Sequence, residues 1–137
     1  MFSLSAKGVY GLTALMDLGA NRSKGSVQIR DVADRNGIPQ HYLEQILVAL
    51  KKAGYVESYR GAQGGYALAR DPDTISVTEV LAQLEGRLEV VSDSRKEGVL
   101  SFFWSDLQQT LEDALGKSLG DLLREKALRD RRADYVI

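Results

Sequence analysis

The sequence has 137 residues, 44% of them hydrophobic and 27% charged, which is typical of one globular domain that can bury a core. It contains no cysteine, and this excludes disulfides, thiolate catalysis, cysteine-ligated zinc and all-cysteine iron–sulfur centres. The net charge is −1, but residues 1–70 carry nine Lys/Arg and five Asp/Glu (net +4), whereas residues 71–137 carry nine and fourteen (net −5).

A basic first half suits a phosphate backbone, although ordinary variation of surface charge explains the asymmetry equally well. The apolar stretch from residue 1 to residue 20 is interrupted by Lys7 and Asp17, and no cleavage site follows it. We therefore expect a cytoplasmic protein with no membrane partner.

Three helices are predicted in the first 54 residues. The first begins at a Ser5 cap and ends near Ala20. Its expected buried face is Val9, Leu12, Leu15, Met16 and Gly19. A short helix then carries Ile29, Val32 and Ala33 and stops at Asn36–Gly37, and the next has an inward stripe of Leu43, Ile46, Leu47 and Leu50. The pair matches a helix-turn-helix, and the alternative is a helical hairpin within a bundle.

The segment after the third helix favours the first of these alternatives. Residues 55–60 and 66–70 are short aromatic and apolar runs separated by the glycine-rich residues 61–65, which predicts a hairpin. A hairpin directly after a helix-turn-helix is a wing. We expect Arg60 at its shoulder to reach a groove or a phosphate, and Gly64 and Gly65 to let the backbone lie close to DNA. The predicted fold class is mainly α with a small β-hairpin wing.

Three helices are predicted after the wing. Ser76 and Glu79 form a capping-box pattern that opens a helix ended by Gly86, and residues 87–98 read as a polar loop. A long helix then carries one apolar stripe, which either folds back on its own core or packs against a second copy. We favour a homodimer formed through Leu100, Phe103, Trp104, Leu107, Leu111 and Leu115.

The last segment is polar until its final residues. Ser118 can cap a further helix, and residues 124–134 are almost entirely charged, which usually indicates a solvated tail. The expected division is a DNA-binding domain at 1–86, dimerisation helices at 87–130 and a flexible tail at 131–137.

Residues 38–47 and 60–68, together with 5–12 and 103–107, resemble the IscR/NsrR/CymR-type family of bacterial winged-helix transcription regulators. The resemblance covers nearly the whole chain. It implies a homodimer joined through the long helix, with the helix from Gln40 to Ala53 in the major groove and the wing in the minor groove. It also implies a regulator, not an enzyme. The sequence agrees, because it offers one histidine, no cysteine and no phosphate-loop motif.

The resemblance also predicts which residues contact DNA. Gln40, His41, Glu44 and Gln45 have the hydrogen-bonding groups for reading bases, although Glu44 and Gln45 equally suit a solvated helix end. Phosphate contacts are expected from basic and tyrosine side chains, with surface solubility as the alternative. These are Lys7, Tyr42, Lys51 and Lys52.

Cluster-binding members of the family hold an iron–sulfur centre with three cysteines in the segment that matches residues 88–104, where this chain has none. We therefore expect no cofactor and no metal. The chain is most similar to the family's cluster-free member, the cysteine-metabolism repressor CymR, in which a complex with cysteine synthase (O-acetylserine sulfhydrylase) governs repression. The resemblance implies a repressor of cysteine and sulfur metabolism. The alternatives are a regulator with another effector that is not iron–sulfur, or a winged helix used for protein contacts.

The chain ends in Tyr135, Val136 and Ile137, which is similar to the tails that serine acetyltransferases insert into cysteine synthase. A terminal carboxylate can be captured by backbone amides, and cysteine synthase must already hold the α-carboxylate of an amino acid. We expect Ile137 to dock there in competition with O-acetylserine. The alternative is a frayed terminus.

Overall fold

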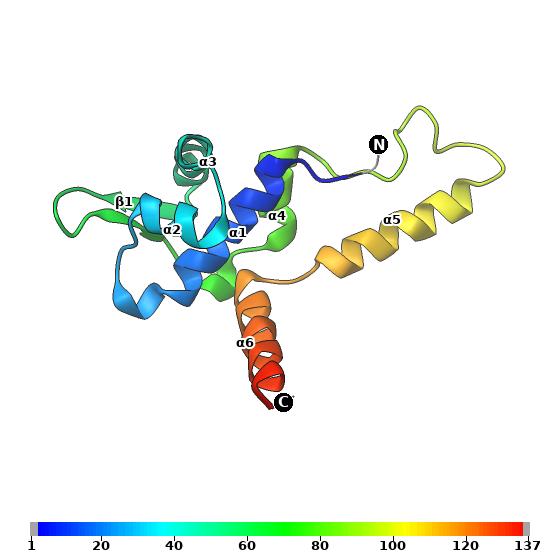
Figure 1. The fold of residues 1–137 in the computed structure, drawn as a ribbon. Helices are drawn as coiled ribbons and strands as arrows, with labels where there is room; N and C mark the ends of the chain where they lie inside the picture. Colours follow the sequence, from blue (N-terminus) through cyan, green and yellow to red (C-terminus); the bar gives the residue numbers. More distant parts are fainter. Residues whose placement is uncertain (1–2, 136–137) are drawn as a thin grey trace.

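The computed structural model describes residues 3–135, and its order of elements is that of a winged helix-turn-helix followed by two further helices (Figure 1). The predicted fold class is confirmed. The elements in chain order are α1 (Ala6–Ala20), the short 3-10 turn η1 (Arg22–Lys24), α2 (Ile29–Asn36), α3 (Gln40–Lys52), β1 (Val56–Tyr59), β2 (Gly65–Leu68), the 3-10 turn η2 (Pro72–Thr74), α4 (Val77–Glu85), α5 (Ser101–Leu115) and α6 (Leu119–Tyr135).

The core lies between α1, α2, α3, α4 and the base of the wing. The predicted stripe of α3 is confirmed, since Leu43, Ile46, Leu47 and Leu50 are all buried. Gly37 ends α2 in the left-handed conformation, with φ 63° and ψ 33°, as its position after Asn36 predicted. The turn between α2 and α3 thus depends on Gly37, because glycine adopts this conformation without steric strain from a side chain.

The buried face of α1 differs from the predicted one. Val9 is 48% exposed, and the buried residues of the helix are Gly8, Gly11, Ala14, Leu15 and Leu18. The reason is the close approach of α4, because a Cβ atom at Gly11 would overlap the side chain of Leu84. The small residues of α1 form much of the face that packs against the core. The prediction relied mainly on large apolar residues and therefore identified only part of that face.

The start of α1 is capped by a residue from another helix. Ser5 occupies the predicted N-cap position, but its side chain accepts no bond from the helix. Instead, the carboxylate of Glu85 accepts hydrogen bonds from Ser5 N (3.0 Å), Gly8 N (2.9 Å) and the Ser5 hydroxyl. The hydroxyl of Ser5 is the main cause that lowers the pKa of Glu85. The end of α4 therefore stabilises the beginning of α1.

The wing is an antiparallel pair in which Val56 lies opposite Leu68 and Tyr59 opposite Gly65. Near its tip it is tied to the segment before α2, because Val27 and Tyr66 exchange two backbone hydrogen bonds of 2.8 Å. Gly65 has φ 145°, and any Cβ at this position would collide with the carbonyl of Val27. Glycine is required here for a close backbone contact within the protein.

The helices after the wing begin and end mostly as predicted. Ser76 caps α4 by accepting a bond from Glu79 N (3.2 Å), and Gly86 ends the helix with φ 83°. Residues 87–98 form no helix or strand. Ser118 and Asp121 form a reciprocal capping box at the start of α6, with bonds of 2.9 and 3.0 Å.

The charged C-terminal region is helical as far as the structure describes it. α6 continues to Tyr135, so residues 131–135, which were expected in the C-terminal tail, are helical. Ion pairs one turn apart support it, among them Arg129–Glu125 at 3.1 Å. The charges are solvent-exposed, as expected. Val136, Ile137 and the side chain of Tyr135 lie outside the described residues.

Candidate nucleic-acid interface

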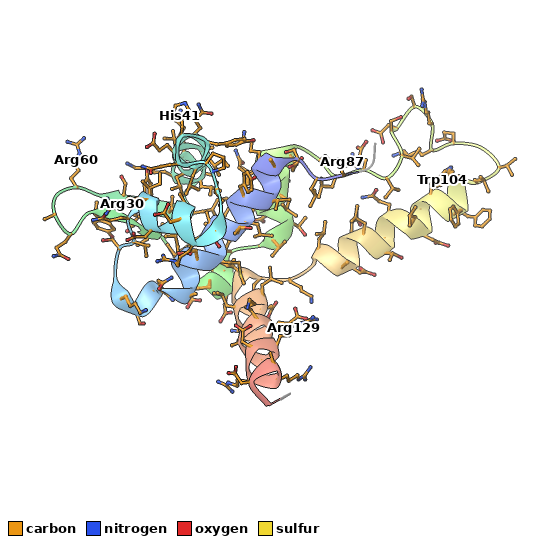
Figure 2. All side chains as sticks on the ribbon, viewed as in Figure 1. Arg30, His41, Arg60, Arg87, Trp104 and Arg129 are labelled. Carbon is orange, nitrogen blue, oxygen red and sulfur yellow. The ribbon has the colours of Figure 1, made fainter. Side chains whose placement is uncertain are left out.

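The outer surface of α3 and the wing lie beside each other, and Figure 2 shows His41 on α3 and Arg60 on the wing extending toward the same side of the molecule. Every residue of α3 that was expected to read bases is exposed, while the apolar stripe faces inward. These residues are Gln40, His41, Glu44 and Gln45. The fold thus brings the predicted reading residues to one surface.

The polar side chains in the first turns of α3 are held together only loosely. The His41 side chain is 86% exposed, and its Nδ1 lies 3.9 Å from Glu44 Oε2. Its other ring nitrogen lies 3.4 Å from Gln45 Nε2. Such long, exposed contacts contribute little to stability. These side chains can therefore leave one another and bind base edges at a small cost in free energy.

Tyr42 and Lys7 are less accessible than the reading residues. The ring of Tyr42 is half-buried and packs edge-on against Tyr10, with 5.8 Å between centroids and an interplanar angle of 90°. This geometry is a favourable aromatic packing contact, so at least part of the role of Tyr42 is structural. Lys7 is also half-buried, and its charge helps to lower the pKa of Glu85.

Lys51 connects α3 to the wing. Its Nζ donates a hydrogen bond to Ser58 Oγ on β1 (2.5 Å). Arg60 follows β1, is exposed, and forms no salt bridge with any residue that the structure describes. The two glycines at the tip have structural reasons of their own. A Cβ at Gly64 would lie 2.6 Å from the carbonyl oxygen of Tyr59, so the turn itself requires glycine there.

Two cations that the sequence analysis did not select lie next to the wing. Lys24 and Arg30 are exposed and line a polar hollow of about 460 Å³, whose other wall includes Gln63 and Gly64 of the wing tip. Sequence spacing could not find them, because they are brought to the wing by long-range contacts, Val27 with Tyr66 and Ser26 with Gln63.

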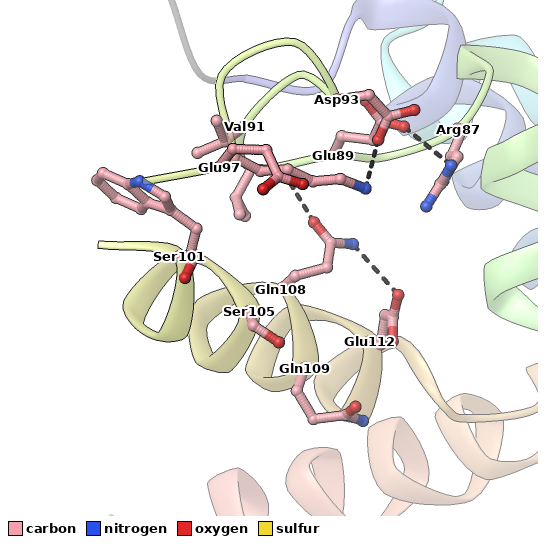
Figure 3. A pocket seen from close by; sticks show the side chains of 13 residues that line it. Arg87, Glu89, Val91, Asp93, Glu97, Ser101, Ser105, Gln108, Gln109 and Glu112 are labelled. Atoms are coloured by element: carbon pink, nitrogen blue, oxygen red, sulfur yellow. Dashed lines mark hydrogen bonds and ion pairs between the residues drawn. The ribbon is translucent and has the colours of Figure 1, made fainter. Parts of the chain in front are cut away.

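The loop before α5 belongs to the segment that matches the cluster-binding region of the resembled family, and a hollow of about 550 Å³ lies between this loop and α5 (Figure 3). Gln108 spans this hollow, accepting a bond from Val90 N (2.9 Å) and donating one to the carbonyl of Leu88 (2.9 Å). Two of the acidic residues here are paired with cations, Glu89 with Arg87 (3.1 Å) and Asp93 with Lys96 (2.6 Å).

These residues do not fit an iron–sulfur cluster. The chain has no thiolate to offer, and within residues 3–135 no three acidic or histidine side chains are grouped closely enough to hold a metal ion. The hollow beside Gln108 is therefore lined by ion pairs and amides and not by cluster ligands.

α5 carries its apolar residues on the outside. No residue of this helix is buried, and its contact with the rest of the chain is slight (Figure 1). Phe102 is 65% exposed, Phe103 48% and Leu107 42%, and Leu100 just before the helix is 47% exposed. The predicted stripe does not fold back on the core of its own chain. Of its members, Trp104, Leu111 and Leu115 are half-buried.

None of the helices described between residues 3 and 135 has both the length and the apolarity to span a bilayer.

Comparison with known proteins agrees with this architecture. Residues 4–125 match the family model Rrf2, described as an iron-dependent transcriptional regulator. The transcriptional regulator IscR of Xenorhabdus nematophila is 34% identical over 135 residues, covering 93% of this chain and 82% of that protein. The regulator CymR of Bacillus subtilis is 35% identical over 115 residues, covering 82% of both chains.

Solved structures give the same result. The structure of CymR, titled the global cysteine regulator of B. subtilis, superposes with a TM-score of 0.82 at 33% identity and covers 91% of this chain and 98% of that one. The IscR of T. potens gives 0.77 at 38% identity, covering 90% and 88%. The relatives are regulators of transcription, which confirms the predictions of a DNA-binding regulator and of a protein that is not an enzyme. The chain belongs to the Rrf2 family of transcriptional regulators.

Proposed function

We propose that the protein is a homodimeric repressor that reads a specific operator with α3 in the major groove and the wing in the minor groove. The observation that carries this proposal is the shared surface of α3 and the wing: His41 extends toward the same side as Arg60, and Gln40 and Gln45 are exposed on the same helix as His41. Amide and imidazole groups on a helix of this size can form paired hydrogen bonds with base edges. A cation on the wing can neutralise phosphate or enter the narrower groove.

The dimer is supported by the exposed apolar residues of α5. Phe102, Phe103 and Leu107 would leave a large apolar surface in water if the helix stayed alone. A second copy covers this surface with an identical one, and two-fold pairing places two recognition helices on two half-sites about one helical turn apart.

The test is selection of operator DNA from a random-sequence pool, followed by fluorescence anisotropy of the enriched site. We expect a two-fold symmetric site bound by a dimer. Failure to enrich any sequence would refute operator binding and would favour the alternative of a winged helix used for protein contacts.

We further propose that the repressor controls cysteine and sulfur metabolism through a complex with cysteine synthase. Two findings support this. The relatives include CymR, whose structure is titled a cysteine regulator, and the present chain lacks cluster ligands. The proposed contact is through Tyr135, Val136 and Ile137. α6 leads toward these residues and away from α3 and the wing, so the same protomer could engage both partners (Figure 1).

Calorimetry against the host's cysteine synthase tests this proposal, comparing the chain that ends at Ile137 with one shortened to Tyr135. We expect binding by the longer chain alone, and its loss when O-acetylserine is added. A matched control is unchanged operator binding by the shortened chain. Equal binding by the two chains, or binding by neither, would contradict the proposal and would favour a different effector that is not iron–sulfur.

A further inference from the structure

We propose that Lys24 and Arg30, together with the adjoining edge of the wing tip, bind a backbone phosphate of the operator beside the groove that the wing enters. This surface extends the interface beyond α3 and the wing. The inference rests on the proposed mode of DNA docking, and it assigns a contact to η1 and to the start of α2.

The first step of the argument is rigidity. The hydroxyl of Ser26 donates to the carbonyl of Gln63 at the wing tip (2.7 Å). Val27 and Tyr66 exchange two backbone bonds of 2.8 Å, and the Gly65 backbone packs directly on the Val27 carbonyl. The wing is therefore attached to the segment that separates η1 from α2. Wherever the wing docks, Lys24 and Arg30 are carried to the same place.

The second step is charge. The hollow is lined by three cations and one carboxylate, that of Asp31. Arg35 is committed to Asp17, with 2.8 Å between nitrogen and oxygen. Lys24 and Arg30 form no salt bridge with any residue between 3 and 135. An unpaired, exposed cation keeps its mobile counterions, and it releases counterions from DNA when it neutralises a phosphate.

The third step is the shape of the hollow and its remaining lining. Apart from Val27 and Ala62, its remaining walls are polar side chains and wing backbone, including Gln28, Gln63 and Gly64. Amides and cations together are the groups that proteins use to hold phosphate oxygens. The hollow also opens beside the wing tip, so the phosphate nearest the wing's groove is the anion most accessible to it.

A phosphate contact has a measurable signature. Each phosphate neutralised contributes about 0.9 to the slope of log binding constant against log salt concentration. With one such contact in each protomer of a dimer, the double variant Lys24→Gln/Arg30→Gln should lower the slope by about 1.8. The wild type would then lose about tenfold more affinity than the variant between 50 and 200 mM salt.

The experiment measures anisotropy on the selected operator and on unrelated DNA across that range of salt. The control is Arg131→Gln/Arg132→Gln, which removes the same charge from an exposed part of α6. We expect the slope to fall on both DNAs for the first variant and on neither for the control. An unchanged slope, or an equal fall in both variants, overturns the inference. Operator binding by the wild type then keeps the proposed function intact, whereas absence of that binding removes the proposed function itself.

Discussion

Leu107→Asp should separate the proposed dimer. In the single chain Leu107 is 42% exposed, so a partner would remove from water close to half of a leucine side chain. Full burial of a leucine is worth roughly 1.5–3 kcal/mol, and the part that remains exposed is therefore worth about 1 kcal/mol per protomer. Two-fold symmetry doubles this to about 2 kcal/mol per dimer.

The introduced carboxylates add to that loss. Each would be taken out of water without a cation partner in an apolar contact, and this costs at least about 1 kcal/mol even with partial hydration. The total of at least about 4 kcal/mol corresponds to a dissociation constant raised about a thousandfold. Operator affinity should fall with it, because half-site recognition needs two recognition helices.

Sedimentation equilibrium over a range of protein concentration is the appropriate assay, with operator anisotropy as the second readout. The matched control is Gln109→Asp, which introduces the same charge at an exposed polar position of the same helix. We expect the control to remain dimeric. A Leu107→Asp protein that sediments as the wild-type dimer does would show that α5 is not the dimer contact.

Three further predictions follow from the site and the core. Gln40→Ala and His41→Ala should change the binding preference at particular base pairs by about 1–3 kcal/mol, whereas Arg60→Ala should weaken binding to all DNA sequences alike. If all three variants lost the same binding free energy on every sequence, base reading by α3 would be refuted. Anaerobic treatment with iron and sulfide should leave the protein colourless, and a stoichiometric visible chromophore would disprove the conclusion drawn from the missing thiolates. Asp17→Asn should cost about 2 kcal/mol of unfolding free energy at pH 7, measured by urea denaturation, and a cost that did not change with pH would contradict the assignment to ionised Asp17.

The pH dependence of that last variant follows from the surroundings of Asp17. Its side chain is 7% exposed, and it accepts bonds from Arg35 Nε (3.0 Å) and Asn36 Nδ2 (2.8 Å). Burial raises the pKa of Asp17, but these bonds outweigh burial and hold the pKa below its usual value. A lowered pKa gives stability that is complete above the unfolded-state pKa of about 3.9 and is lost as pH falls through the folded-state pKa. The difference between the wild type and Asp17→Asn should therefore narrow below about pH 4.

Local patterns in the sequence predicted what local physics determines. The stripe of α3, the left-handed Gly37 and the Ser118 cap each depend on residues within a few positions of one another. The capping of α1 by Glu85 could not be predicted in this way, because donor and acceptor are 77 and 80 residues apart. For the same reason the buried face of α1, which packs against α4, was only partly predicted.

In the candidate site, too, local patterns were predictable and long-range contacts were not. The reading residues of α3 could be selected because they lie off an apolar stripe on one helix. Lys24 and Arg30 could not, because they are brought to the wing by long-range contacts, the pairing of Val27 with Tyr66 and the bond from Ser26 to Gln63. Gly64 and Gly65 were expected at the wing tip because glycine lets the backbone lie close to DNA. The structure shows that contacts within the protein already require glycine at both positions.

The attachment of α5 has a consequence for regulation in the proposed dimer. Its C-terminal end is held to α4, since Thr78 Oγ1 donates to the carbonyl of Leu115 (3.0 Å) and Val77 N donates to that of Lys117 (3.0 Å). Its middle is joined to residues 88–90 by the two hydrogen bonds of Gln108. In the dimer, the angle between the two DNA-binding units would then be set by one firm attachment and one polar bridge. Because the spacing of the two recognition helices has to match that of the two half-sites, this attachment would bear on operator recognition without involving α3 itself.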